Sequence, residues 1–198
     1  GQIVINDEPE QTIHPEARAS DRSKGLSREL YAGFSRNFGN LQQMSTGSPP
    51  PYIIQEQYYQ TAGADVLYED LFDHENHFLY LHGLWRNKEE SLVHARDTTD
   101  FEDYLAVRFF ATTVNVVMGP EGEAPIKVRV TIDGAPVASE QVGADISYDD
   151  DGSSYVLVDE FRMYRLVKLM EFEGHELKIS PNMADLGVYA YTFGAYMN

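Results

Sequence analysis

Beyond residue 77 the sequence alternates apolar and polar side chains with a period of two, and this rhythm most limits the folds open to the chain. It is clearest at 126–132, which reads Ile-Lys-Val-Arg-Val-Thr-Ile. It recurs in four further segments, 105–109, 114–116, 176–180 and 189–193. Successive side chains of a β-strand point to opposite faces of its sheet, so each segment is predicted to be a half-buried strand.

Turn residues separate these segments. Asp133-Gly134 is a two-residue hairpin signal, and 119–122 and 173–174 are predicted to punctuate other strand pairs. Short strands with turns at intervals of about 8–12 residues indicate a sandwich or barrel. No long amphipathic helix follows residue 40, which disfavours a parallel sheet. The sequence therefore predicts an all-β fold, an antiparallel β-sandwich of jelly-roll type with eight or nine strands.

The first fifty residues read differently. Residues 1–25 are polar and read as an arm. Ser27 can cap a short helix over 28–38, because Leu30, Tyr31, Phe34 and Phe38 share one helical face. Three prolines at 49–51 then exclude any helix or central strand at that point. We expect an N-terminal arm or linker with a short helix over 1–50 and a sandwich domain over 51–198, in which 51–76 is a candidate insertion.

Composition excludes several classes of protein. The net charge of −17 repels phosphate backbones, so we expect no nucleic-acid partner. No apolar stretch reaches the 18 residues of a membrane-spanning helix, and the N-terminus lacks a signal-peptide pattern, so no membrane insertion is expected. The absence of cysteine excludes disulfides and thiolate chemistry within the chain. Because the chain starts at Gly1 rather than at Met, we expect flanking domains to be missing from it.

Six short motifs occur in an order that resembles one known family. They are Ser27–Gly33, close to (T/S)PE-x-Y-x-G with Arg28 in place of the proline; His77–Trp85, ending in G-x-W; Phe109–Val117, F-x-A-x-x-V-x-x-V; Val130–Pro136, V-x-x-D-G-x-P; Gly143–Val167, G-x-D…D-G…R-L-Y-x-L-V; and Ala190–Gly194, a shortened A-Y-x-F-T-F-G. Together they resemble the domain that follows the thioredoxin fold in DipZ-type, TlpA-like proteins. The resemblance covers 27–40 and 77–195 and has no counterpart for 41–76.

This resemblance implies a sandwich of the galactose-binding, carbohydrate-binding-module type. It also implies that the thioredoxin domain of the same protein is a partner, and that this absent domain carries any redox activity. The location would be extracytoplasmic if the chain follows the DipZ-type proteins, and otherwise cytoplasmic.

Four residues are candidates for ligand contact: Tyr31, Trp85, Arg162 and Tyr164. An exposed indole stacks on the apolar face of a sugar, but Trp85 is as readily explained as a core anchor. Arg162 and Tyr164 share one face of a strand by parity. Arg162 could present its guanidinium to a ligand, or instead tie Asp145 or Glu160.

Metal and catalytic signals are weaker. Asp149 and Asp151 lie on a glycine-containing turn and are candidates for calcium, although the EF-hand spacing is absent and a solvated loop explains them equally well. The histidines are interpreted as structural; His77 and His82 would point to opposite faces of a strand, which argues against a shared zinc ion. No Gly-x-Ser-x-Gly elbow or glycine-rich phosphate loop occurs. We therefore expect no enzyme and no cofactor beyond a candidate calcium ion.

Two functions remain open. One is an accessory module that binds a saccharide. The other is a structural domain that packs on its thioredoxin domain or forms a homodimer, using the aromatic face of residues 30–38 and the tyrosines of the candidate insertion. Of the adjacent pair Tyr58 and Tyr59, one is expected to point inward.

Overall fold

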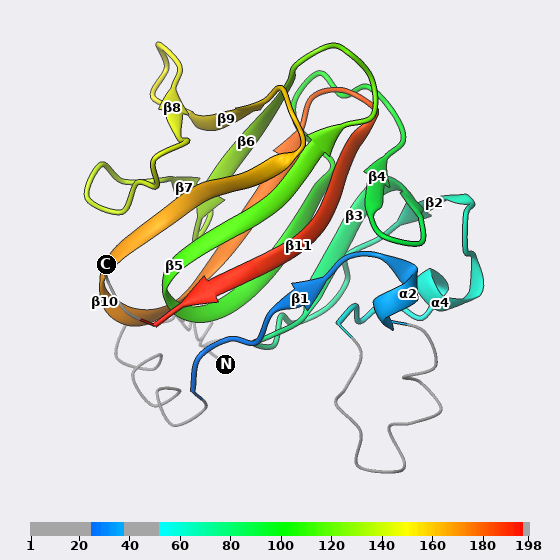
Figure 1. Ribbon diagram of the computed structural model, residues 1–198, viewed down its shortest axis with the longest axis horizontal. Helices are drawn as coiled ribbons and strands as arrows, with labels where there is room; N and C mark the ends of the chain where they lie inside the picture. Colours follow the sequence, from blue (N-terminus) through cyan, green and yellow to red (C-terminus); the bar gives the residue numbers. More distant parts are fainter. Residues whose placement is uncertain (1–24, 38–51, 196–198) are drawn as a thin grey trace, which may run out of the picture.

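The computed structural model describes residues 25–37 and 52–195, in which two layers of antiparallel strands face each other (Figure 1). The strands are β1 (Leu30–Tyr31), β2 (Asp65–Tyr68), β3 (Leu79–Asn87), β4 (Leu92–His94), β5 (Tyr104–Pro120), β6 (Ile126–Ile132), β7 (Ala135–Pro136), β8 (Ser147–Tyr148), β9 (Ser154–Val158), β10 (Arg162–Pro181) and β11 (Leu186–Gly194). The helices are the single turns α2 (Phe34–Asn37) and α4 (Gln57–Gln60). No helix within these residues is long and apolar enough to cross a membrane.

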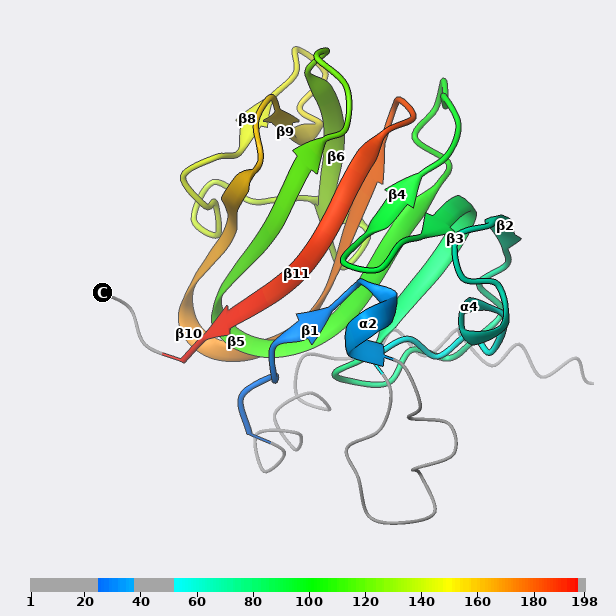
Figure 2. The same cartoon turned by 45° about the vertical axis from the view of Figure 1, so that its right-hand side comes forward.

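The two longest strands, β5 and β10, belong to both layers. They pair with each other from Arg162↔Met118 at one end to Ile179↔Leu105 at the other, with a register shift between Lys168 and Glu173. Both strands curve at the same end of the molecule (Figure 2). The front layer of Figure 1 is therefore β10–β5–β11–β1, and the rear layer is β9–β6–β10–β5–β3–β2.

The core fills the space between the layers, and the predicted sandwich is confirmed. Along β6, buried and half-buried residues alternate without exception, as the period of two requires. The largest fully buried side chains include Trp85, Phe109, Tyr164 and Tyr191. Eleven strands are present in the described part, against the eight or nine expected, because β1, β7 and β8 are only two residues long.

The helix predicted over 28–38 is wrong in its first half. Leu30 and Tyr31 form strand β1, paired with Tyr191 and Ala190 of β11, and only Phe34–Asn37 is helical. Leu30 is fully buried in the core, and the Ala32 N–H donates to the Tyr189 carbonyl at 2.8 Å. Pairing with β11 therefore overrides the helical spacing. Phe38 lies outside the described residues.

Of the three predicted turns, two separate strands as expected and one is wrong. Residues 119–122 end β5 and lead toward β6. Asp133 and Gly134 have φ angles of 51° and 80° and join β6 to β7, as a two-residue hairpin demands. Gly174, by contrast, lies within β10 opposite Phe110. A Cβ atom on Gly174 would stand 2.5 Å from the Phe110 ring, so this glycine permits a close approach rather than a turn.

The candidate insertion contributes to the core. Tyr58 is fully buried and its hydroxyl donates to the Ala32 carbonyl at 2.7 Å, while Tyr59 is half-buried, so one of the pair points inward as expected, although from helix α4 and not from a strand. Asn87 donates a side-chain hydrogen bond to the Tyr58 carbonyl. Ile53 forms a parallel bridge with Leu79 of β3. Residues 52–68 are therefore built into the edge of the sandwich.

A buried carboxylate ties three chain segments together beside this edge. Asp103 is fully buried and accepts hydrogen bonds from the Leu84 N–H at 2.9 Å, from His94 Nε2 at 3.0 Å and from Arg96 Nε at 2.8 Å. Burial acts to raise the pKa of Asp103, but the bonds from Arg96, Leu84 and His94 outweigh it and hold the pKa below its ordinary value. The buried charge is thus matched by a buried His94 and by Arg96, whose side chain reaches it from the surface.

Gly83 makes room for this carboxylate, so Gly83→Ala is predicted to destabilise the fold. The glycine has φ +92°, and a Cβ atom would lie 1.9 Å from Asp103 Cγ. Strain plus displacement of the carboxylate should lower the free energy of unfolding by about 3 kcal/mol or more in urea denaturation. Gly122→Ala is the control, because nothing lies within 4 Å of its Cβ position. Equal stability of the two variants would contradict this account.

Candidate functional site

The outer face of the front layer carries side chains that no other described element covers. Alternation along β5 and β10 points every second residue away from the core, and the pairings Met163↔Val117 and Arg165↔Asn115 place these residues side by side. We call this surface the open face. It consists of Asn115, Val117, Phe161, Met163, Arg165, Tyr189 and Thr192, with Tyr31 and Lys168 at its margins.

The open face is organised in rows across the strands. One row is polar: Arg165 lies opposite Asn115, and Asn115 Nδ2 donates to Thr192 Oγ1 at 3.3 Å. The neighbouring row is apolar and contains Met163 and Val117. The Arg165 guanidinium forms no ion pair with any residue of the described ranges. The row thus offers a free cation, an amide and a hydroxyl to a ligand.

An aromatic pair forms the end of the open face that lies at the start of β10. The Phe161 and Tyr189 rings meet edge to face, with centroids 4.8 Å apart and planes at 81°. Phe161 packs directly over Gly119, because a Cβ atom on Gly119 would stand 2.9 Å from the Cα atom of Phe161. Phe161 remains 63% exposed. A large ring left this exposed, on a face that also carries polar groups, is a typical ligand platform.

Two of the four candidate ligand residues, Trp85 and Tyr164, lie in the core and are unavailable to a ligand. Trp85 is fully buried, and its Nε1 donates to the His82 carbonyl at 2.8 Å, so the core-anchor interpretation replaces the stacking one. Tyr164 is fully buried as well, with its hydroxyl donating to the Glu160 carbonyl at 2.8 Å. Strand parity placed Arg162 and Tyr164 on one face correctly, but that face points inward.

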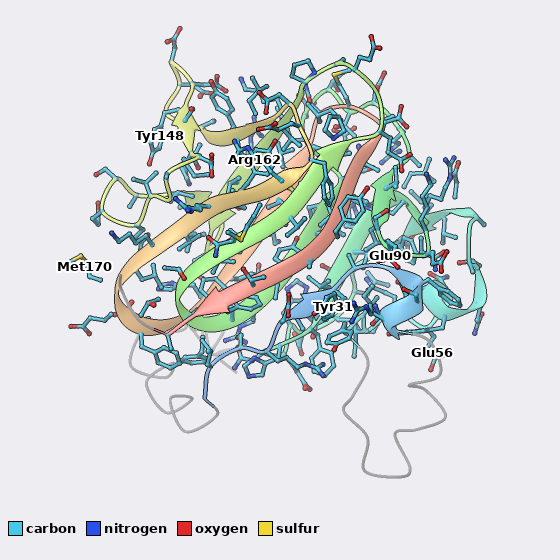
Figure 3. The ribbon with its side chains drawn as sticks, viewed as in Figure 1. Tyr31, Glu56, Glu90, Tyr148, Arg162 and Met170 are labelled. Atoms are coloured by element: carbon cyan, nitrogen blue, oxygen red, sulfur yellow. The ribbon has the colours of Figure 1, made fainter. Side chains whose placement is uncertain are left out.

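The other two candidates, Arg162 on β10 and Tyr31 on β1, lie at opposite edges of the front layer, with β5 and β11 between them (Figure 3). Arg162 bonds Asp145 at 2.9 Å and Glu160 at 3.3 Å, which confirms the ion pairs suggested for it, and its guanidinium lies 3.8 Å from the Tyr164 ring centroid. Tyr31 is half-buried and its hydroxyl donates to Glu29. Only Tyr31 borders the open face.

The two calcium candidates are engaged with protein groups. Both Asp149 oxygens accept from Lys127 Nζ, at 2.6 and 2.7 Å. Asp151 accepts from the Ser153 N–H at 2.9 Å. Across residues 25–37 and 52–195, no group of three or more His, Asp or Glu side chains gathers as a metal-ligand set. Calcium at Asp149 and Asp151 remains a prediction from the sequence alone.

A second surface lies on the outer face of the rear layer. The segment 69–77, here called the strap, crosses β3, β5 and β10. The His74 ring stacks on the Tyr80 ring with centroids 3.9 Å apart. Its Nε2 lies 2.8 Å from Asp70 Oδ2, and its Nδ1 lies 2.7 Å from Glu176 Oε2. Tyr104 donates to Asp70 at 2.8 Å. His74 therefore fastens the strap to the sheet from both ring nitrogens.

Beside the strap lies a groove of about 790 Å³, here called the acidic groove. It is lined by 54–57, Leu67 of β2, Tyr80 of β3 and the strap residues Glu69, Leu71, Phe72, Asp73 and Glu75. Its volume is within the range of ligand sites in proteins.

Comparison with known proteins identifies the chain. Residues 27–194 match the family described as thioredoxin like C-terminal domain. The chain belongs to this family. The motif resemblance to a domain that accompanies thioredoxin folds is thereby confirmed at the level of the family. No curated protein matches this chain.

Solved structures resemble the thioredoxin-like C-terminal domain only remotely. A family two carbohydrate esterase from Clostridium thermocellum, in complex with cellohexaose, is 12% identical with a TM-score of 0.38, and the match covers 53% of this chain and 27% of that one. A family two carbohydrate esterase from Cellvibrio japonicus is 12% identical with a TM-score of 0.36, covering 60% and 35%. The domain spans about a quarter to a third of these chains, and so distant a likeness carries no functional inference.

Sequence reasoning missed both surfaces. The polar positions of the open face are the polar half of the alternation, as at Asn115 between two valines, whereas Val117 and Met163 are apolar outward positions that the alternation does not mark. Phe161 stands just before its strand, so parity could not place it. The leucines and carboxylates of the acidic groove fall in 54–75, where no motif was recognised.

The bonds of His74 make stability dependent on pH. Burial acts to lower the pKa of His74, but the hydrogen bonds to Glu176 and Asp70 outweigh it and raise the pKa above the ordinary 6.5. The stabilisation is therefore complete below pH 6.5 and is lost as pH rises through the raised pKa.

We predict that the stability lost in His74→Gln, measured by urea denaturation, is larger at about pH 5.5 than at about pH 8.5. His82→Gln is the control, because the His82 ring stacks on Tyr104 and makes no ion pair with a described residue. A loss in His74→Gln that is the same at both pH values would refute the role given to the imidazolium.

Proposed function

We propose that this thioredoxin-like C-terminal domain is a non-catalytic accessory module of a thioredoxin-family protein, and that its open face binds a saccharide. The single observation that carries the proposal is the Phe161–Tyr189 ring pair, with Phe161 exposed, on the same face as the polar row Arg165–Asn115–Thr192 and separated from it by the apolar row of Met163 and Val117. A pyranose ring has apolar faces and polar edges, so a chain of sugars suits a surface that offers aromatic carbon at one end and hydrogen-bonding groups further along the same face.

The rigidity of the surface supports the same proposal. The polar row belongs to three hydrogen-bonded strands, β10, β5 and β11, and not to loops. A backbone held in a sheet reorganises little when a ligand binds, which favours affinity. A face without deep walls suits an extended chain of sugars better than a single enclosed one.

The accessory role follows from the family and from composition. The chain contains no cysteine, so thiol redox chemistry of a whole protein would reside outside it. The shared motifs support placing the domain with the DipZ-type, TlpA-like proteins, and with them an extracytoplasmic location. The thioredoxin domain of the same protein is then its covalent partner.

A structural role is the alternative, favoured by the apolar row of Met163 and Val117. Met163 is exposed, and an apolar row of this kind also suits contact with a thioredoxin domain or a second copy. Light scattering distinguishes the two: a stable dimer that Met163→Ser dissociates supports the structural role, whereas a monomer removes the homodimer.

The saccharide proposal predicts binding that depends on the open face. Calorimetric titration with cellohexaose, xylohexaose and chitohexaose should detect at least one ligand. Phe161→Ala should weaken its binding by about fivefold to tenfold, because an aromatic contact contributes about 0.5–1.5 kcal/mol beyond the area it buries. Arg165→Gln should weaken it as well, through loss of a charged donor.

Met170→Ala is the control, because this exposed residue lies at the bend of β10, away from the Phe161–Tyr189 pair. Absence of binding across a broad glycan array, or binding that neither open-face variant changes, would overturn the proposal.

A further inference from the structure

The acidic groove combines exposed apolar side chains with free carboxylates, and the saccharide proposal uses neither. Three large apolar residues border it: Leu67 is 58% exposed, Leu71 83% and Phe72 47%. Water contact with so much clustered apolar surface is unfavourable, and clusters of this kind mark interaction sites.

The rim of the acidic groove is uniformly negative. Glu56, Glu69, Asp73 and Glu75 line it, and no Lys, Arg or His does. None of these four side chains forms an ion pair with any residue in 25–37 or 52–195. Acids that stand just outside the groove are paired, as in Asp65 with Arg86 and Asp70 with His74. The carboxylates that line the groove therefore have no cationic side chain of the described residues beside them, unlike these two neighbours.

We propose that the acidic groove binds an extended basic segment of another protein, with apolar side chains seated on Leu67, Leu71 and Phe72 and with Lys or Arg side chains reaching the rim carboxylates. Charge complementarity selects this occupant. Opposite charges attract such a segment to the rim, and burial of its apolar side chains against the leucines and the phenylalanine then holds it.

Two other occupants fit less well. Two of the three exposed apolar residues, Leu67 and Leu71, are aliphatic and offer no π-face for a sugar to stack on, so that Phe72 stands without the second ring that the Phe161–Tyr189 pair has on the open face. A second copy of this chain carries a net charge of −17 and is repelled by four carboxylates. The groove and the open face also belong to different layers, so the two ligands do not compete for one surface.

The probe is a fluorescein-labelled nine-residue peptide in which lysine alternates with leucine, followed by fluorescence polarisation. We expect saturable binding to the wild-type chain and none for the same peptide with glutamate in place of lysine. Leu71→Ser and Phe72→Ser should each weaken binding about tenfold, which corresponds to about 1.4 kcal/mol. Both residues are exposed, so these variants should keep the wild-type melting temperature.

A pair of charge variants separates a site from general attraction to an acidic protein. The groove triple Glu69→Gln, Asp73→Asn, Glu75→Gln should weaken binding about tenfold or more. The matched triple Glu123→Gln, Glu140→Gln, Asp150→Asn removes the same charge from exposed positions outside the groove lining and should change it less than about twofold.

Three results would overturn the proposal. The first is no peptide binding, or equal losses in the two triple variants, which would leave only non-specific attraction. The second is displacement of the peptide by cellohexaose with loss of sugar binding in Leu71→Ser, which would make the groove a saccharide site. The third is a dimer that Leu71→Ser dissociates. Failure of the open face, by contrast, would show in the Phe161→Ala titration and leave these results unchanged.

Discussion

The pairing of β5 with β10 is the interaction on which the rest of the fold depends. Because both strands continue through the bend, their hydrogen bonds hold the front and rear layers in a single sheet folded over its own core. The register shift near Lys168 allows the bend without ending either strand. Outward from this pair, β11 and β1 extend the front, while β6, β9, β3 and β2 extend the rear. Strand β4 pairs with both β11 and β3, and β7 and β8 pair with β6 and β9.

This arrangement explains why the two candidate surfaces differ in character. The open face lies on regular strands, so its rows are set by cross-strand register and its side chains have fixed neighbours. The acidic groove lies where the strap and residues 54–57 overlie the rear layer, and its shape depends on a few side-chain bonds, above all those of His74. A sheet face suits repetitive ligands, whereas a groove walled by loops suits a segment with specific anchors.

The strands and the hairpin at Asp133-Gly134 could be predicted from the sequence, because a period of two and a turn with positive φ angles are local properties. The sequence was insufficient for the surfaces, because neighbours such as Arg165 and Asn115 are brought together by register, which no local pattern encodes. Parity grouped Arg162 with Tyr164 but could not say which face was covered. Local patterns also failed at residues 28–33. Their spacing is typical of a helix, but Leu30 and Tyr31 form a strand because they pair with β11.

Native-state amide hydrogen exchange followed by NMR tests most directly whether the β5–β10 pair unites the layers. If it does, amides of the front-layer pairs, such as Val116 opposite Tyr164, exchange with the same free energy as those of the rear-layer pairs, such as Val107 opposite Leu177. That shared value equals the free energy of global unfolding. Front-layer amides that open at a free energy lower by about 2 kcal/mol or more would show that the layers unfold separately, and would contradict the account.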